Sequence, residues 1–320
     1  MLSSFKPNPA PAFVLASLMM AQIYFVRRFP QPGESLQALD LYCETGGKGL
    51  NVLLGLHKLG IPLHGLIPCG TTPLSQHQCQ DILSLHQLTH INRVTVGEYN
   101  GHGVALIDEA GQNQITVHAG ANALLTAEHI QPQTSAIQQA SLVYASFESS
   151  ETAICAAFTL AQAAGRLTVL NPSPFKPLTP SMLALSDVLI MNQSEAAAWL
   201  QVDQSALATR QAAQHVLHEL QFTQRYPGKS LILTLGDQGA IALLDDGSWH
   251  EHAAYSTTVV DSLGAGDAFA SALLASLLQS SDLTRALEHG CASASLLIRQ
   301  RGVIDNLPTP TSLQTFISAQ

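Results

Sequence analysis

Short apolar runs alternate with helix-like stretches along most of this chain, and that alternation most constrains its fold. Strands joined by helices run parallel, and the sheet they form must be covered on both faces. The sequence therefore predicts one three-layer α/β domain over residues 1–320, with a mainly parallel central sheet and helices on both faces. The predicted strands are 13–19, 63–68, 142–145, 167–170, 188–191 and 231–235. The predicted helices are 49–59, 72–88, 151–164, 193–200, 206–220 and 268–278.

Two segments break this alternation. Residues 22–44 and 94–118 carry the period of strands without intervening helices. Together they predict a small antiparallel sheet that stands off the main body and acts as a lid. The alternative is that they are edge strands of the main sheet.

Charge and cysteine content exclude several classes of protein. The net charge is −9, from 14 basic and 23 acidic residues, and no Lys/Arg run occurs, which disfavours a nucleic-acid partner. No apolar run reaches the ~20 residues of a membrane span, so we expect no membrane partner. The five cysteines are widely spaced and form no C-x-x-C, which fits reduced thiols in a cytoplasmic protein.

The apolar stretch at residues 12–20 follows Lys6 and has two interpretations. A signal peptide would look similar. However, the stretch leads directly into residues 22–26, which alternate like a strand, and this favours a buried first strand.

The segment from Asp261 to Phe269 carries the clearest chemical signal. Two carboxylates, Asp261 and Asp267, bracket a loop of small residues, and a predicted helix follows at once. Small residues let backbone N–H groups converge on an anion, and the positive end of the helix would point at the same place. Asp267 would then lie beside a phosphate-sized hole, where it could deprotonate a hydroxyl group next to a phosphoryl group in transfer.

Two other motifs adjoin predicted helices. Gly46-Gly47-Lys48-Gly49 resembles a P-loop only superficially, because Gly49 stands where Ser or Thr is required, and a tight strand-to-helix connection is the alternative.

Asn192 and Glu195 follow a predicted strand. Glu195 could hold Mg²⁺ through water, whereas Asn192 could simply cap the next helix. The thirteen histidines show no zinc-site spacing.

Five segments carry a family resemblance. They are Gly46-Gly47-Lys48-Gly49-Leu50-Asn51, His118-Ala119-Gly120-Ala121-Asn122-Ala123, Asn171-Pro172-Ser173-Pro174, Asn192-Gln193-Ser194-Glu195 and Asp261-Ser262-Leu263-Gly264-Ala265-Gly266-Asp267. In this order, from about residue 30 to 315, they resemble the ribokinase branch of the PfkB carbohydrate kinase family. The resemblance implies a ribokinase-like α/β fold and an ATP-dependent kinase that uses Mg²⁺ and K⁺. It also implies a small sugar or sugar-like substrate and a homodimer that forms through the lid.

The resemblance also implies roles for single residues. Asp267 would be the base, and the N–H groups of Gly264, Ala265 and Gly266 would form the anion hole. The residues that would contact the sugar are Gly47, Lys48, Asn51 and Glu148. Those that would lie along ATP are Asn192, Thr234, Gly236 and Gly239, with Glu195 organising Mg²⁺. Those near a monovalent-cation site would be Asp261, Leu263, Gly302 and Asn306.

One departure from the family pattern concerns the sugar. Met19 and Ala21 fall where the family usually carries Asn and Asp, whose side chains hold sugar hydroxyls. Three hypotheses follow: a kinase for a different acceptor, a sugar kinase in which Gln22 or Glu44 substitutes, and a non-catalytic sensor that binds ATP or a metabolite. Retention of Asp267 and its loop argues against the third.

Overall fold

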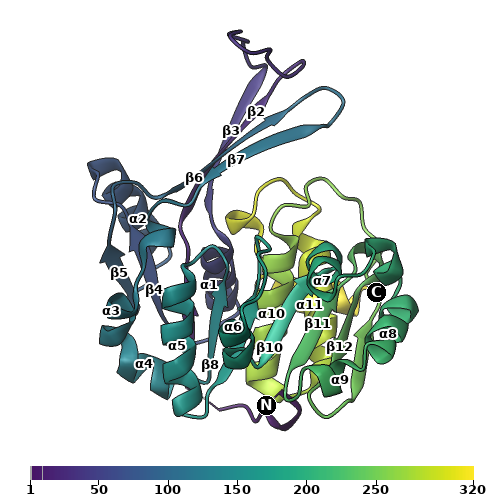
Figure 1. Ribbon diagram of the computed structural model, residues 1–320. Coiled ribbons are helices and arrows are strands. Elements are labelled where there is room, and N and C mark those ends of the chain that lie inside the picture. Colours follow the sequence, from purple (N-terminus) through teal and green to yellow (C-terminus); the bar gives the residue numbers. More distant parts are fainter. Residues whose placement is uncertain (1, 9) are drawn as a thin grey trace.

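The computed structural model describes residues 2–8 and 10–320, which form a large and a small sheet (Figure 1). The large sheet has the strand order β13-β12-β11-β10-β9-β8-β1-β4-β5. Its strands are β1 (Ala12–Leu15), β4 (Leu63–Cys69), β5 (Ile91–Thr95), β8 (Leu142–Ser146), β9 (Leu167–Asn171), β10 (Val188–Asn192), β11 (Ser230–Thr234), β12 (Ala240–Leu243) and β13 (Trp249–His252). All pairs from β5 to β11 are parallel, and β12 and β13 add antiparallel pairs at one edge. The prediction of a mainly parallel sheet is confirmed.

Helices cover both faces of this sheet, so the three layers predicted from the sequence are present (Figure 1). The helices on one face are α1 (Lys48–Lys58), α2 (Pro73–Leu85), α10 (Ala265–Ser280), α11 (Leu283–Leu297) and α12 (Pro310–Ser318). Those on the other face are α3 (Ala127–Ile130), α4 (Thr134–Gln139), α5 (Glu151–Ala163), α6 (Pro180–Leu185), α7 (Gln193–Leu200), α8 (Arg210–Glu219) and α9 (Phe222–Arg225). The helix predicted at 206–220 begins later, because Thr209 caps α8 by accepting a hydrogen bond from Ala212 N. No helix of the described residues is long and apolar enough to cross a membrane.

The first strand is shorter than predicted. β1 lies fully buried between β8 and β4, as expected of a core strand, but it ends at Leu15. Met19 already begins β2 (Met19–Phe25) of the small sheet. Because the apolar run continues through this change of sheet, the sequence pattern does not reveal it.

The small sheet, which we call the lid, has the order β3-β2-β6-β7 and projects away from the main body (Figure 1). Its other strands are β3 (Asp40–Gly46), β6 (Gly101–Ile107) and β7 (Asn113–His118). The prediction of an antiparallel sheet is wrong for the central pair, since β2 and β6 run parallel. Residues 94 and 95 belong to the edge strand β5 of the main sheet, so the edge-strand alternative holds for them.

Helices α1 and α10 pack closely beneath the lid. A Cβ atom on Gly55 would lie only 2.5 Å from the Cβ of Ser271, so glycine at this position allows the close approach. One turn towards the N-terminus of each helix are Asn51 and Asp267, whose side chains therefore meet.

Candidate active site

Asp267 lies in the first turn of α10, directly after the loop Gly264–Ala265–Gly266, which we call the anion loop. Gly264 precedes the helix with a φ of 72°, a left-handed conformation that suits glycine. The 16-residue helix directs its positive end at this loop. The Ala265 N–H donates a long hydrogen bond of 3.3 Å to Ser262 O.

The Asp267 carboxylate is only 5% exposed and contacts two polar side chains. Asn51 Nδ2 donates to Asp267 Oδ2 at 2.7 Å, and Lys48 Nζ lies 3.9 Å from Oδ1. Burial raises the pKa of Asp267, and both neighbours oppose that rise. The carboxylate in turn raises the pKa of Lys48. The structure thus brings together Asp267, Asn51 and Lys48.

Glu148 holds the glycine-rich turn that precedes α1. Its Oε2 accepts hydrogen bonds from Lys48 N at 2.7 Å and from Ser17 Oγ at 2.6 Å, and Ser17 Oγ accepts one from Gly49 N. Burial raises the pKa of Glu148. A Cβ on Gly47, whose φ is 117°, would lie 2.5 Å from Ser17 O, so this turn is also the tight connection considered from the sequence.

Met19 and Ala21 lie on the face of β2 that also carries Ile23 and Phe25, both of which line the cleft under the lid. Met19 Sδ lies 3.3 Å from Asn122 Nδ2. This face of β2 is therefore apolar. Gln22 is exposed on the opposite face and accepts a hydrogen bond from the Tyr24 hydroxyl, so its side chain is directed away from the cleft.

Two adjoining cavities meet at the anion loop. A cleft of about 770 Å³ runs under the lid past Lys48, Asn192 and Asp267. A second cavity of about 570 Å³ is lined by Gly239 and by side chains of α10 and α11. The residues that line both are Thr234, Gly236, Ser262, Ala265 and Gly266. An elongated ligand could therefore extend from the second cavity along the anion loop to Asp267.

Asn192 and Glu195 form a capping box at the start of α7. Asn192 Oδ1 accepts from Glu195 N, and Glu195 Oε2 accepts from Asn192 N, both at 2.9 Å. The helix-cap alternative is confirmed for Asn192, which also lines the cleft.

Asp261, Leu263, Gly302 and Asn306 lie together beside the anion loop. Asp261 Oδ1 accepts from Leu263 N at 2.9 Å, and Oδ2 lies 3.5 Å from Gly302 N. Asn306 Nδ2 donates to the carbonyl oxygens of Arg301 and Gly302. The carboxylate and carbonyl oxygens are the donor type that hard cations prefer, while the Asn306 amide arranges the carbonyl groups.

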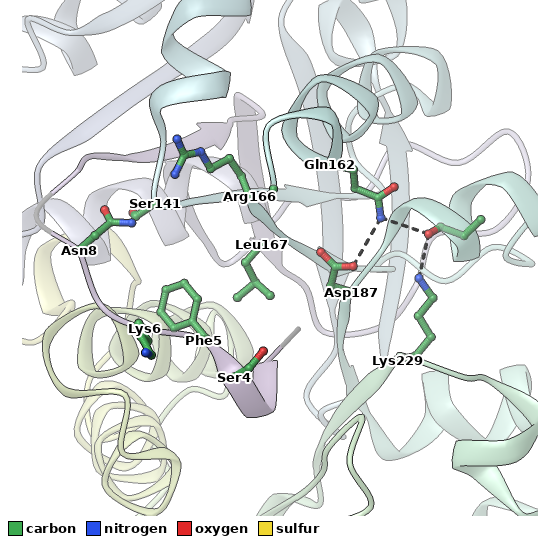
Figure 2. A pocket seen from close by; sticks show the side chains of 12 residues that line it. Ser4, Phe5, Lys6, Asn8, Ser141, Gln162, Arg166, Leu167, Asp187 and Lys229 are labelled. Carbon is green, nitrogen blue, oxygen red and sulfur yellow. Dashed lines mark hydrogen bonds between the residues drawn. The ribbon is translucent and has the colours of Figure 1, made fainter.

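A separate cavity of about 670 Å³ lies near the starts of β9, β10 and β11 (Figure 2). In contrast, Asn192 and Thr234 of the cleft end β10 and β11. Several polar side chains of the separate cavity form hydrogen bonds within the protein. Gln162 contacts Asp187 Oδ1, and both Gln162 and Lys229 donate to Ala184 O. Asp187 Oδ2 also accepts from Thr168 N, so the carboxylate ties strand ends together.

Sequence reasoning missed several residues of the site. Ser17 contacts Glu148 across 131 positions, and its only sequence signal is its place after the first strand. Arg301 lines the cleft. Glu44 of the lid, considered from the sequence only as a substitute sugar ligand, accepts a hydrogen bond from Val303 N. A single sequence gives no signal for these last two contacts, because they join segments far apart along the chain.

Comparisons with known proteins agree with this geometry. The pfkB family carbohydrate kinase model matches residues 11–310. Ribokinase of Staphylococcus aureus (strain COL) is 29% identical over 297 residues, covering 92% of this chain and 95% of that protein. Deoxyribokinase of Salmonella typhi is 23% identical over 307 residues, covering 95% and 98%. The structure of Arabidopsis thaliana ribokinase complexed with ribose and ATP matches with a TM-score of 0.85 at 20% identity, covering 96% of this chain and 98% of that chain, and it has the same fold.

Proposed function

We propose, from the premise that this chain belongs to the pfkB family of carbohydrate kinases, that it transfers the γ-phosphate of ATP to a hydroxyl group of a small sugar-like molecule. The observation that carries this proposal is the buried Asp267 carboxylate beside the anion loop, where the two cavities meet. The similarity to ribokinase and deoxyribokinase supports a sugar-like acceptor.

In the proposed mechanism, Asp267 accepts the proton of the acceptor hydroxyl as that oxygen bonds to the transferred phosphorus and the bond to the ADP oxygen breaks. The proton can leave late, because the transition state of phosphoryl transfer is loose. The N–H groups of Gly264, Ala265 and Gly266 stabilise charge on the transferred group. Lys48, 3.9 Å from Asp267, keeps the carboxylate ionised and adds positive charge to the cleft.

Bound groups have defined places in this proposal. ATP lies along Asn192, Thr234, Gly236 and Gly239, since these residues line the cavities that adjoin the anion loop. Glu195, whose Oε2 also caps α7, would hold Mg²⁺ through water, and the ion would supply positive charge to the phosphates. The oxygen-rich group of Asp261, Leu263, Gly302 and Asn306 would hold K⁺, which would supply positive charge beside the anion loop.

The acceptor contacts Gly47, Lys48, Asn51 and Glu148 on its polar side. On its other side it meets the lid, where Met19 and Ala21 offer no oxygen acceptor for hydroxyl groups. We therefore favour an acceptor less hydroxylated than ribose on the edge that faces β2, because a buried hydroxyl group without a partner weakens binding.

The remaining proposals concern the domain organisation, the localisation and the oligomeric state of the protein. We place all 320 residues in one cytoplasmic kinase domain, in which the lid closes over the cleft. Apolar side chains exposed on the lid, such as Ile115 and Val117, support a homodimer formed through it.

A screen of ATP consumption over sugars, deoxysugars and nucleosides, with Mg²⁺ and K⁺ present, tests the proposal. We expect turnover on at least one of these alcohols. ATP binding without turnover on any of them would instead favour a non-catalytic sensor of the same fold.

The Asp267→Asn variant tests the assigned base. We expect kcat to fall by ~10² or more with ATP affinity little changed, because the amide cannot accept the proton. Asp246→Asn, in the exposed turn between β12 and β13, is the matched control. Turnover of Asp267→Asn near that of the wild type would remove Asp267 from the mechanism.

A further inference from the structure

Glu44 is an acidic residue on the lid that the proposed mechanism does not use. It lies in β3 opposite Ala21 of β2, on the face that carries Tyr42. Its Oε1 accepts a hydrogen bond from Val303 N, which lies 259 positions away in the chain. The Ile304 N–H and the Tyr42 hydroxyl also lie close enough to the carboxyl group to lower its pKa, which burial raises. The lid thus places a half-buried carboxylate on a single backbone segment of the main body.

Other lid side chains contact the same segment. The Arg301 guanidinium lies 5.1 Å from the ring centroid of Phe25 and 6.0 Å from that of Tyr42. Gly302 has a φ of 91°, and a Cβ there would lie 2.5 Å from the Tyr42 hydroxyl oxygen. Residues 301–303 are therefore the place where β2 and β3 dock on the main body.

Val303 connects this docking segment to the anion loop. Its side chain is buried and lies directly against Gly264, since a Cβ on Gly264 would be 2.6 Å from both Cγ atoms of Val303. Gly264 is the residue whose left-handed conformation starts α10 and sets the direction of the N–H groups that follow. The position of Val303 therefore constrains the anion loop.

We propose that Glu44 is a positioning residue, which holds Val303 against Gly264 when the lid is docked and so couples the lid to the geometry of the anion loop. The inference rests on the proposed function for its activity measurement. In this arrangement the N–H groups of the anion loop are fully aligned only while the lid covers the cleft, so that transfer to the acceptor is favoured over transfer to water.

The kinetic test compares Glu44→Ala with Glu44→Gln, which keeps an oxygen to accept from Val303 N. We expect Glu44→Ala to lower kcat by about 10-fold or more, with the KM for ATP little changed, because small misplacements of catalytic groups slow the reaction strongly. Glu44→Gln restores most of kcat. Asp40→Ala, at the exposed start of the same strand, is the matched control and keeps wild-type kinetics.

Hydrogen exchange of the segment spanning residues 299–307 gives a readout that does not need activity. Glu44→Ala should speed exchange there, and Glu44→Gln should not. If Glu44→Ala fails to fold, Val303→Ala replaces it and should lower kcat similarly by loosening Gly264.

The outcomes separate this inference from the proposed function. Unchanged kcat in Glu44→Ala, or an equal loss in Glu44→Gln, overturns the positioning role while leaving phosphoryl transfer intact. If no acceptor supports turnover in the wild type, the proposed function fails, and unchanged exchange at 299–307 in Glu44→Ala would still overturn the docking contact independently.

Discussion

Asp267 is buried, Lys48 is partly exposed, and each shifts the pKa of the other. Burial raises the pKa of Asp267 above its ordinary value of 3.8, and the nearby Lys48 charge opposes the rise. A base must be ionised to work, so kcat/KM should fall as the pH drops through this raised pKa. Within the site, Lys48 therefore extends activity towards lower pH.

Lys48→Met tests this relation. Removing the cation should raise the pKa of Asp267 further and move the acid limb of the kcat/KM profile to higher pH, since a nearby opposite charge lowers a carboxylate pKa. Measuring kcat/KM as a function of pH tests this expected shift of the acid limb. The control is Lys229→Met, because Lys229 donates to Ala184 O in the separate cavity. An acid limb that stays in place would contradict the assigned interaction.

The neighbours of Ala21 bear on any attempt to restore ribose binding. Ala21 lies directly opposite Glu44 in the β2–β3 register, so a carboxylate introduced at position 21 would face a second carboxylate. Like charges directly opposite each other on adjacent strands are destabilising. Position 21 therefore lacks an acidic residue, and the residue directly opposite it, Glu44, is acidic.

We predict that Met19→Asn with Ala21→Asp raises kcat/KM for ribose only modestly, and that adding Glu44→Gln raises it by a further 10-fold or so. The gain comes from charge-assisted hydrogen bonds worth about 1.5–3 kcal/mol each, once the repulsion is removed. Steady-state kinetics on ribose measure both variants. Equal values for the double and triple variants would show that Glu44 does not limit the substitution.

At the scale of elements, the distance between α1 and α10 sets the geometry of the site. The close contact of Gly55 with Ser271 lies one helical turn from the hydrogen bond between Asn51 and Asp267. A methyl group at position 55 would overlap the Ser271 side chain and push the helices apart. The same packing that stabilises the core therefore positions the base.

Gly55→Ala should destabilise the protein by about 1–3 kcal/mol, as overpacking in cores does, and should also lower kcat. Urea unfolding and steady-state kinetics measure the two effects. Ser271→Gly added to Gly55→Ala should recover part of both, and Ser271→Gly alone is the control. A loss of stability with unchanged kcat would show that the contact between Gly55 and Ser271 does not determine the position of Asp267.

Elements whose signals are local were predictable from the sequence. The parallel sheet followed from the alternation of apolar runs and helices, and the loop before Asp267 followed from its small residues and the helix after it. The register of the lid was not predictable. The period of a strand shows which face a residue occupies but not its partner strand, so the parallel pairing of β2 with β6 carries no local signal.

Contacts between segments far apart in the sequence were also not predictable. Ser17 with Glu148 and Glu44 with Val303 join residues 131 and 259 positions apart, and each depends on which strands and loops the fold brings together. The family resemblance placed residues near ATP and the sugar, but it did not anticipate these supporting contacts.

At the scale of the whole molecule, the lid leaves apolar side chains uncovered. It projects from the body, and Ile115 and Val117 of its edge strand β7 are 62% and 61% exposed (Figure 1). Exposed apolar side chains on an unpaired edge strand favour association with another chain. A second copy of the lid would cover them.

We therefore predict that the wild type has about twice the 34.0 kDa chain mass in light scattering, and that Ile115→Lys with Val117→Lys yields the monomer, because two charges would be buried without partners. Thr116→Lys, on the same strand but on the opposite face, is the matched control and should keep the dimer. Because Ile115 also lines the cleft, turnover is compared in Val117→Lys alone: if that variant is monomeric and loses turnover, pairing of the lids is needed to close the cleft over Asp267. If the monomeric variant keeps its turnover, the lid of one chain is sufficient for catalysis, and pairing contributes only to stability. A wild type that remains monomeric at micromolar concentrations would contradict the predicted pairing.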